Sequence, residues 1–514
     1  MKQITRILCL LLALLMLLPM AIACRKEEEE APETETQEVT QTETETETEI
    51  ITDKWGQVVV DDGIPDELDY GGKTVNVLIR SGEQYRYEWN LEKPQTSVDQ
   101  EIYYRNLAVA EELGITWNFV VTDEGTGLKT INEKILNTGK SGLGGIDIVN
   151  NYRNGAANTN LIPFYMDVRS DKFTYLNLDQ PYWSKNINEA AESFGRQYFF
   201  AGDMNLSLYD RAIVVFFNKT QLEPSTGMTV DQLYQTVLDG DWTYEKLYNM
   251  TKGIYEDTGK TAGVRDYDDF YGISSIWISE ASDGLLYAWD LALSEENEDG
   301  THRVVTETGK TKMIEAFDKL TALLYGNGAY LNRTTSMDNI KHFTQGHAVF
   351  NIDVLYHFAA QATELAAMED GYGVVPTPKY DDNQTEYYSG MQDAHNIMSV
   401  MYYGLGNYEM ISAVLELTAS KSYETVRPFY VETVVKGQRL DANSGKCFEL
   451  IMAGVTLDWT DIYEPSIGSV RGNLWRTPFK TYEEGGSVVD AFASKAESIN
   501  EKIATIDEWL VTHY

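Results

Sequence analysis

The sequence is poor in cysteine, histidine and basic residues for its length. Its 514 residues include three cysteines and six histidines, and 41 lysines and arginines stand against 80 acidic residues, a formal net charge of -39 at pH 7. Three cysteines are too few for a disulfide framework, and we predict that Cys447 is a free, buried thiol. A surface this acidic repels phosphate backbones, and no basic stripe interrupts it. We therefore predict no binding to nucleic acid.

Motifs of common catalytic and metal sites are also missing. The chain has no Gly-x-Ser-x-Gly elbow, no Walker-type phosphate loop, no His-Glu-x-x-His and no Gly-x-Gly-x-x-Gly after a strand. His342, His347 and His357 are the closest group of histidines, but their spacing does not put them on one helix face. The acidic runs at 266–269 and 295–300 match calcium loops only in part, and we interpret them as solvated turns. We predict neither a metal nor a cofactor.

The first 24 residues have the pattern of an export signal. Lys2 and Arg6 precede an apolar run at 7–20 that is too short and wrongly flanked for a membrane span. Small residues then precede Cys24, and this arrangement resembles a bacterial lipoprotein signal, with Ala21 where that signal usually carries Leu. The resemblance implies removal of residues 1–23 and attachment of a lipid to Cys24. An ordinary secretory signal cut after Ala23 is the alternative.

An acidic segment follows the signal. Residues 25–49 are nearly all Glu, Thr, Gln and Pro, with almost no apolar side chains to bury. Such a stretch repels itself and stays extended. We interpret residues 24–66 as a lipidated cysteine with a tether that leads to a folded body.

Strand and helix signals alternate from Gly72 onward, which predicts an α/β fold with a parallel sheet. A helix is expected to begin at Ser97, with Ser97 and Gln100 forming a capping box, and another to begin after Thr243 as its N-cap. Further helices are expected at 410–419 and 488–509. The expected strands are 74–79, 117–121, 146–149, 212–217, 348–352, 372–375 and 395–401.

Several segments, taken together and in order, resemble one family. They are Val98–Asn106 with Glu111–Ile115, Gly202-Asp203 before Val214–Lys219, Gly240–Thr243, Phe343–Phe350 and Tyr372–Tyr380. This set is similar to extracellular solute-binding proteins of family 1, the sugar-type receptors of ATP-binding-cassette (ABC) importers. Val354-Leu355 depart from the Trp-rich sequence that some sugar-binding relatives carry there.

The resemblance implies a two-lobed periplasmic-binding-protein-like fold of type II, in which strands cross a hinge and a ligand cleft lies between the lobes. Mapped on this chain, residues 67–212 and 389–426 form the first lobe. Residues 213–388 and 427–514 form the second. A ligand that contacts both lobes stabilises the closed state.

The aromatic content of the loops also suits a sugar. The chain has 33 Tyr and 10 Trp, and aromatic rings beside carboxylates and amides match the apolar faces and hydroxyls of carbohydrates. We predict that rings stack on the ligand and carboxylates accept its hydroxyls. The candidate ligand-binding residues are Glu83, Tyr85, Trp89, Asn151, Tyr152, Asp203, Trp277, Asp353, Tyr356, Asp393 and Trp475.

The leading hypothesis is a monomeric, lipid-anchored protein on the outer face of the cell membrane. It would bind an extracellular carbohydrate, an oligosaccharide, and deliver it to an ABC-type permease without enzymatic activity. The alternatives are a surface-anchored glycoside hydrolase, which needs only two suitably spaced carboxylates, and a ligand-binding sensor that works with a kinase.

Overall fold

The computed structural model describes residues 57–80, 88–89, 96–122, 128–158, 160–276, 279–305, 307–326, 328–333, 335–356, 368, 371–403, 406–437 and 441–512. The predicted signal, Cys24 and the acidic segment up to residue 56 lie outside these residues. Within the described ranges, no helix combines the length and the apolar character that a membrane span requires.

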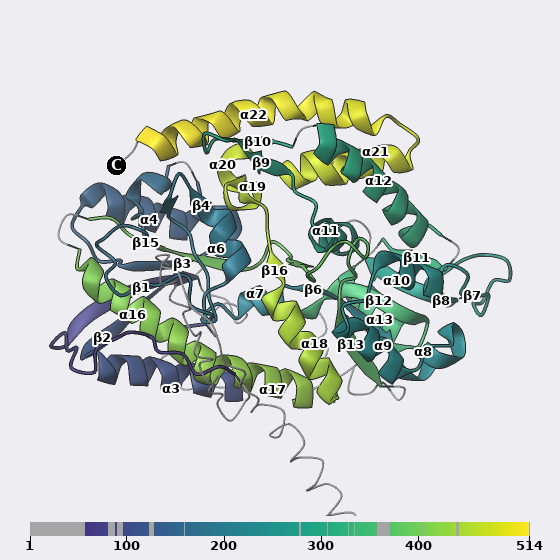
Figure 1. Ribbon diagram of the computed structural model, residues 1–514, viewed down its shortest axis with the longest axis horizontal. Helices are drawn as coiled ribbons and strands as arrows, with labels where there is room; N and C mark the ends of the chain where they lie inside the picture. Colours follow the sequence, from purple (N-terminus) through teal and green to yellow (C-terminus); the bar gives the residue numbers. More distant parts are fainter. Residues whose placement is uncertain are drawn as a thin grey trace, which may run out of the picture. The chain divides into compact units, whose positions relative to one another are not determined.

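The first of two large sheets has the strand order β15-β3-β1-β2 (Figure 1). β1 is parallel to β2 and β3, as the sequence predicted, whereas β15 is antiparallel to β3. β-branched and aromatic residues alternate with polar ones in β2, which fits a strand with one buried face. The bounds are β1 (Lys73–Arg80), β2 (Ile115–Thr122), β3 (Ile148–Tyr152) and β15 (Asn396–Val400).

The second sheet has the order β11-β8-β12-β6-β13. β8 is parallel to β11 and β12, and β6 is antiparallel to its neighbours β12 and β13. Every residue of β6, β12 and β13 is buried, which explains why these segments read as continuous apolar runs. The bounds are β6 (Ile213–Asn218), β8 (Phe270–Ile276), β11 (Ala329–Asn332), β12 (Ala348–Val354) and β13 (Tyr372–Pro376).

Helices connect and cover both sheets. Around the first sheet lie α3 (Ser97–Glu112), α4 (Lys129–Ser141), α5 (Arg153–Ala156), α6 (Lys185–Ala191) and α16 (Tyr408–Lys421). The part of the chain that holds the second sheet contains α8 (Lys219–Thr226), α9 (Val230–Leu238), α10 (Tyr244–Thr251), α11 (Ser279–Ala288), α12 (Glu307–Leu324) and α13 (Ser336–Thr344). The C-terminal part contains α17 (Arg427–Gly437), α18 (Ala442–Ala453), α19 (Trp459–Ile462), α20 (Glu464–Ile467), η4 (Gly472–Arg476), α21 (Thr477–Glu483) and α22 (Val488–Thr512).

The capping box of α3 lies one residue earlier than the sequence predicted. Thr96 is the N-cap and accepts a hydrogen bond from the Asp99 amide, while the Asp99 side chain accepts from the Thr96 amide. Aspartate at the third helical position closes the box, so the pairing predicted for Ser97 and Gln100 is wrong. Thr243 is the N-cap residue of α10 as predicted, but its side chain makes no capping hydrogen bond.

Two segments carry the chain between the sheets, and they lie side by side. The first crossing segment ends at Ala212 and enters β6, and the second passes Met391 before it enters β15; Ala212 and Met391 form a β-bridge. β6 runs antiparallel to β12, and β15 runs antiparallel to β3. Each of these two strands therefore begins beside the carboxyl end of its neighbour. Ile213 pairs with Val354 of β12, and Asn396 pairs with Tyr152 of β3. The crossing segments therefore join the carboxyl ends of the parallel strands in both sheets.

Two apolar clusters form the core. One covers a single face of the first sheet and includes Val75, Val77 and residues of α16. The larger cluster begins on the other face, at Leu78 and Val149, and continues through α19 and α20 into the second sheet. Cys447 is a free, buried thiol within this cluster, as predicted.

The C-terminal part contacts both sheet regions. α19 and α20 pack against α5, while α22 (yellow in Figure 1) packs against β10 (His302–Val304) and α21. The sequence assigned all of 427–514 to the second lobe, and those lobe boundaries stay a prediction. The contacts show that this segment joins the two regions.

Glu88 fixes the first crossing segment to the first sheet. Its carboxylate, fully buried, accepts hydrogen bonds from Asn150 Nδ2 of β3 at 2.7 Å and from Asn396 Nδ2 of β15 at 2.8 Å. It also accepts one at 2.9 Å from the Ser207 amide, at the start of α7 (Ser207–Asp210). One side chain thus connects two strands and the segment that leads to Arg211.

Replacing Glu88 tests this connection. In Glu88→Gln an NH2 group replaces one of the two carboxylate oxygens, both of which accept hydrogen bonds from N–H groups. At least one of these buried N–H donors then loses its acceptor. We expect the free energy of unfolding to fall by about 1–3 kcal/mol, measured by urea denaturation of the full chain. Glu111→Gln, on the exposed face of α3, is the matched control. Equal urea midpoints for the two variants would contradict the role given to Glu88.

Candidate functional site

Polar and aromatic side chains gather where the crossing segments meet the strand ends. Open α/β sheets place their sites at the carboxyl ends of parallel strands, and here both sheets contribute. We call this set of residues the junction. It comprises Tyr152, Arg153, Arg211, Asp283, Tyr356, Gln392, Asp393, His395, Asp461, Glu464, Arg471 and Arg476.

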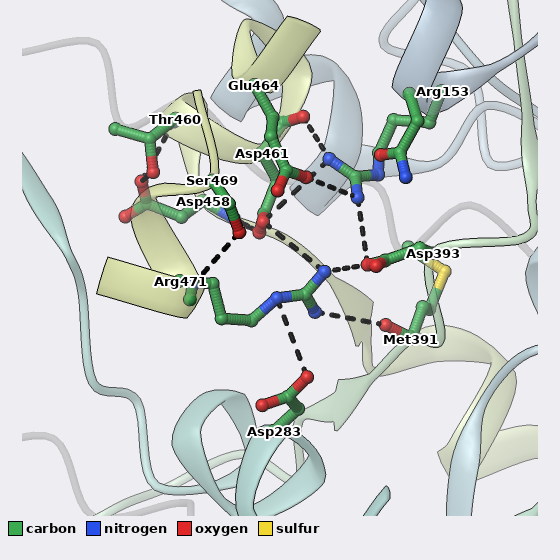
Figure 2. A network of polar contacts seen from close by, with 12 residues as sticks. Arg153, Asp283, Met391, Asp393, Asp458, Thr460, Asp461, Glu464, Ser469 and Arg471 are labelled. Atoms are coloured by element: carbon green, nitrogen blue, oxygen red, sulfur yellow. Dashed lines mark hydrogen bonds and ion pairs between the residues drawn. The ribbon is translucent and has the colours of Figure 1, made fainter. Parts of the chain in front are cut away.

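Arg153 is the centre of an ion-pair network (Figure 2). It follows β3 directly, its side chain is 1% exposed, and it pairs with Asp393 at 2.9 Å and Glu464 at 3.0 Å. Asp461 lies 3.8 Å away and also accepts a hydrogen bond through its main-chain carbonyl. A buried guanidinium requires such partners, because its desolvation costs several kcal/mol.

Arg471 extends the network toward the second sheet region. Its guanidinium pairs with Asp393, which it shares with Arg153, and lies 3.6 Å from Asp283 on α11. Arg476 donates to Asp283 as well, with Nε 3.0 Å from the carboxylate. The network thus connects α5, the second crossing segment, α11 and the C-terminal helices.

α19 is held from both sides. Asp458, its N-cap, accepts hydrogen bonds from the amides of Leu293 and Ser294 at 3.0 and 3.1 Å. At the other end of the capping box, the Asp461 side chain accepts from the Asp458 amide at 3.1 Å and from the Tyr287 hydroxyl. Asp461 also lies 3.8 Å from Arg153, so this short helix joins residues of both parts of the chain.

Burial and nearby charges together set the pKa values of the junction residues. It raises the pKa of Asp461 to about 7, against the opposing effect of Arg153. The pKa of Arg153 is raised because the carboxylates of Asp461 and Glu464 outweigh its own burial. Burial, together with the charges of Arg153 and Arg211, lowers the pKa of His395 to about 3. At neutral pH His395 is therefore uncharged.

Two arginines lie over tyrosine rings. Arg80, at the end of β1, has Cζ 4.7 Å from the ring centroid of Tyr152. Arg211, in the first crossing segment, has Cζ 3.9 Å from the ring centroid of Tyr356, which follows β12. Both tyrosines are half-buried, so each presents polar and aromatic surface at a strand end.

Four of the predicted ligand-binding residues come together at these strand ends. Asn151 and Tyr152 end β3, Tyr356 follows β12, and Asp393 lies in the second crossing segment. Asn151 is buried, with Nδ2 3.4 Å from Asn132 Oδ1. Contact of these residues with a ligand stays a prediction.

The two predicted tryptophans that the structure describes are core residues. Trp89 is 2% exposed, and its ring centroid lies 5.9 Å from that of Trp117. Trp475 is fully buried, stacks on Phe317 at 4.7 Å and donates to the Ser282 carbonyl at 3.0 Å. Their placement does not support the stacking role that the sequence suggested.

Other predicted residues have partners within the protein. Asp203 accepts from the Tyr209 hydroxyl and pairs with Arg427 at 3.3 Å. Asp353 is fully buried and accepts from Asn339 Nδ2 at 2.7 Å. Glu83, Tyr85 and Trp277 lie outside the described residues.

The histidine and acidic clusters do not form a metal site in the part of the chain that the structure describes. Among the described residues, no three or more His, Cys, Asp or Glu side chains form a group that could hold a metal ion; His357 lies outside them. The turn at 266–269 is not solvated as expected, because Asp269 is buried. Its carboxylate accepts hydrogen bonds from the amides of Thr258, Gly259 and Asp266.

The sequence did not identify the arginines and C-terminal acids of the junction. Arg153 directly follows Asn151 and Tyr152, which were predicted to bind the ligand. Its position after a strand could therefore have marked it as a candidate site residue. Asp461, Glu464 and Arg471 lie more than 300 residues away from Arg153 in the chain, and no local pattern connects them.

Comparisons with known proteins identify the fold. No protein-family model matches the sequence, and no curated protein matches it. Among solved structures, the sugar-binding protein MalE from Xanthomonas citri is similar with a TM-score of 0.56 at 12% identity, covering 86% of this chain and 100% of that one. The galacto-N-biose-/lacto-N-biose I-binding protein of a Bifidobacterium longum ABC transporter, in complex with lacto-N-biose, has a TM-score of 0.52 at 14% identity. The match covers 85% of this chain and 98% of the Bifidobacterium longum protein.

This chain is also similar to a sugar transporter protein from Rhizobium etli in an open conformation, with a TM-score of 0.51 at 15% identity. The match covers 83% of this chain and 98% of that one. At these identities the likeness establishes the fold. The chain has the two-lobed α/β architecture of these proteins, as the sequence predicted.

The raised pKa of Asp461 predicts a pH dependence of stability. The folded chain binds a proton at Asp461 that the unfolded chain releases near its ordinary pKa, so this group's stabilising contribution is lost as pH rises toward 7. We expect the unfolding free energy of the wild type, relative to Asp461→Asn, to fall between pH 4.5 and 7.5. The expected change is about 1.4 kcal/mol for each tenfold difference in proton affinity between the folded and unfolded states.

Urea denaturation at the two pH values measures this difference. Asp490→Asn, at an exposed position of α22, is the control. Its unfolding free energy is expected to differ from that of the wild type by the same amount at both pH values. An increase in the wild-type advantage over Asp461→Asn with rising pH would mean that pairing with Arg153, and not burial, sets the titration of Asp461.

Proposed function

We propose that this chain is a carbohydrate-binding protein that binds an extracellular oligosaccharide at the junction and delivers it to an ABC-type permease. The observation that carries the proposal is the fold. The three similar structures named above are sugar-binding or sugar-transport proteins, and one of them holds lacto-N-biose. The carboxyl ends of the strands, where such folds place ligands, carry the polar and aromatic residues of the junction in this chain.

The chemistry of the junction supports the same ligand class. Tyr152 and Tyr356 are half-buried rings that suit the apolar faces of a sugar, and Gln392 and Asp393 are partly exposed groups that suit its hydroxyls. These residues come from both sheet regions and from the crossing segments. A ligand bound among them contacts both lobes and favours their closure.

We further propose that the chain is anchored on the outer face of the cell membrane through a lipid on Cys24. The signal-like residues before Cys24 and the acidic segment after it support this location. A long tether lets a receptor reach ligands away from the lipid surface while it stays near its permease. The permease partner and the monomeric state belong to the same proposal.

Ligand binding is tested by thermal unfolding with a panel of neutral and acidic mono- and oligosaccharides. A ligand present at about 100 times its dissociation constant stabilises the folded state by about 2.7 kcal/mol. For a saccharide that binds, we expect Tyr356→Ala to weaken the affinity by about 1–3 kcal/mol, measured by calorimetry. Tyr104→Ala, at an exposed ring on α3, is the matched control and leaves the affinity unchanged.

The outcome that contradicts carbohydrate binding is an unshifted unfolding temperature with every member of the panel. Chromatography of the bound saccharide after incubation separates this proposal from a glycoside hydrolase. We expect the saccharide to be recovered intact, and new reducing ends in step with protein concentration would favour the hydrolase.

The anchor is tested in cells that process bacterial lipoproteins. Cys24→Ala removes the thiol that would carry the lipid, so we expect the protein to move from the membrane to the aqueous phase of a detergent partition. Cys447→Ala, which removes the buried thiol of α18, serves as the control and stays with the membrane. Membrane association of Cys24→Ala equal to that of the wild type would refute the lipid anchor.

A further inference from the structure

Arg211 differs from the other arginines of the junction in its partners. Arg153 and Arg471 each pair with three carboxylates, and Arg476 pairs with Asp283. Arg211 is 5% exposed, yet no carboxylate of the described residues lies within ion-pair distance of it. Its cation is buried among neutral groups.

The neutral groups around Arg211 do not satisfy it fully. Nη1 donates to Gln392 Oε1 at 3.1 Å, and Cζ lies over the ring of Tyr356. Nε is buried and has no hydrogen-bond partner in the described part of the chain. The ring of Tyr356 stabilises the cation, but a ring does not replace the carboxylate partner that a buried guanidinium requires. An anionic group bound at Arg211 would supply the missing ion pair.

A second polar group near Arg211 is also unpaired. His395 Nδ1–H donates to the Gln392 carbonyl at 3.0 Å, which fixes the neutral ring with its proton on Nδ1. Nε2 is then an acceptor, and it is buried without a partner in the described part of the chain. Arg211 and His395 thus both bond to Gln392, at its side chain and at its carbonyl, and each also has a buried nitrogen with no partner in the described part of the chain.

We propose that the bound oligosaccharide is acidic, and that Arg211 binds a carboxylate of a uronic acid unit. This inference rests on the carbohydrate-binding function proposed above and names the substrate class. A planar guanidinium fork matches a carboxylate. One such cation, in a chain of net charge -39, admits a single negative charge at this point and disfavours a highly charged polyanion.

The direct test compares ligands that differ only in charge. The probes are oligosaccharides of galacturonate, mannuronate, guluronate and glucuronate, each paired with its neutral methyl ester, and sulfated neutral oligosaccharides of equal length. We expect calorimetry of the full chain to show at least one uronate binding about ten- to hundredfold tighter than its methyl ester. This preference should shrink as salt is added.

The variant test asks whether Arg211 causes the preference. We expect Arg211→Gln to lose about ten- to hundredfold in affinity for the uronate and clearly less for the methyl ester. Arg211→Lys, which keeps the charge, should recover part of the loss. Arg303→Gln, at an exposed arginine paired with Glu295, is the matched control. Thermal unfolding without ligand establishes that each variant is folded.

The outcomes separate this inference from the proposed function. Binding of neutral saccharides with no preference for any uronate overturns the inference and leaves the carbohydrate-binding function intact. Tighter binding of the sulfated probes overturns the carboxylate assignment. Equal losses for the uronate and its ester in Arg211→Gln would make Arg211 a packing residue. Failure of every saccharide, charged or neutral, overturns the proposed function itself.

Discussion

Arg153 is a buried cation whose carboxylate partners come from segments far apart in the sequence. Asp393 lies in the second crossing segment, and Asp461 and Glu464 lie on the C-terminal helices. A guanidinium at this depth is stable only while these acids surround it. The positions of the crossing segment and of α19 and α20 against α5 therefore depend on the same few contacts. Arg471 and Asp283 continue this dependence into the second sheet region.

The acidity of the chain has a local exception at the junction. Arginines concentrate where the strand ends meet, and most of them are neutralised by acids that the fold brings from elsewhere. Arg211 is the member whose partners are a ring and an amide. Overall charge is therefore a poor guide to the proposed ligand, because the net charge sums the whole chain whereas the proposed contacts lie at the junction. A protein with a net charge of -39 can still select a negatively charged group at one point.

Local patterns predicted the elements better than the site. The strands at 74–79 and 348–352 and the helix at 488–509 were recognisable because burial and periodicity act over neighbouring residues. The burial of the aromatic residues was harder to predict, because the sequence around a tryptophan is similar whether its indole faces solvent or the core. Trp89 and Trp475 are buried by α-helices and strands that are distant in sequence. The partners of Arg153 are equally distant, so only the assembled fold reveals them.

The proposed binding of a saccharide where the crossing segments meet the strand ends can be observed in solution. Hydrogen–deuterium exchange of the full chain, with and without a bound oligosaccharide, measures this most directly. We expect slower exchange in peptides that cover 151–154, 211–213, 353–356 and 391–396, which belong to both sheet regions and both crossing segments. Protection confined to one sheet region, or located away from these four segments, would contradict it.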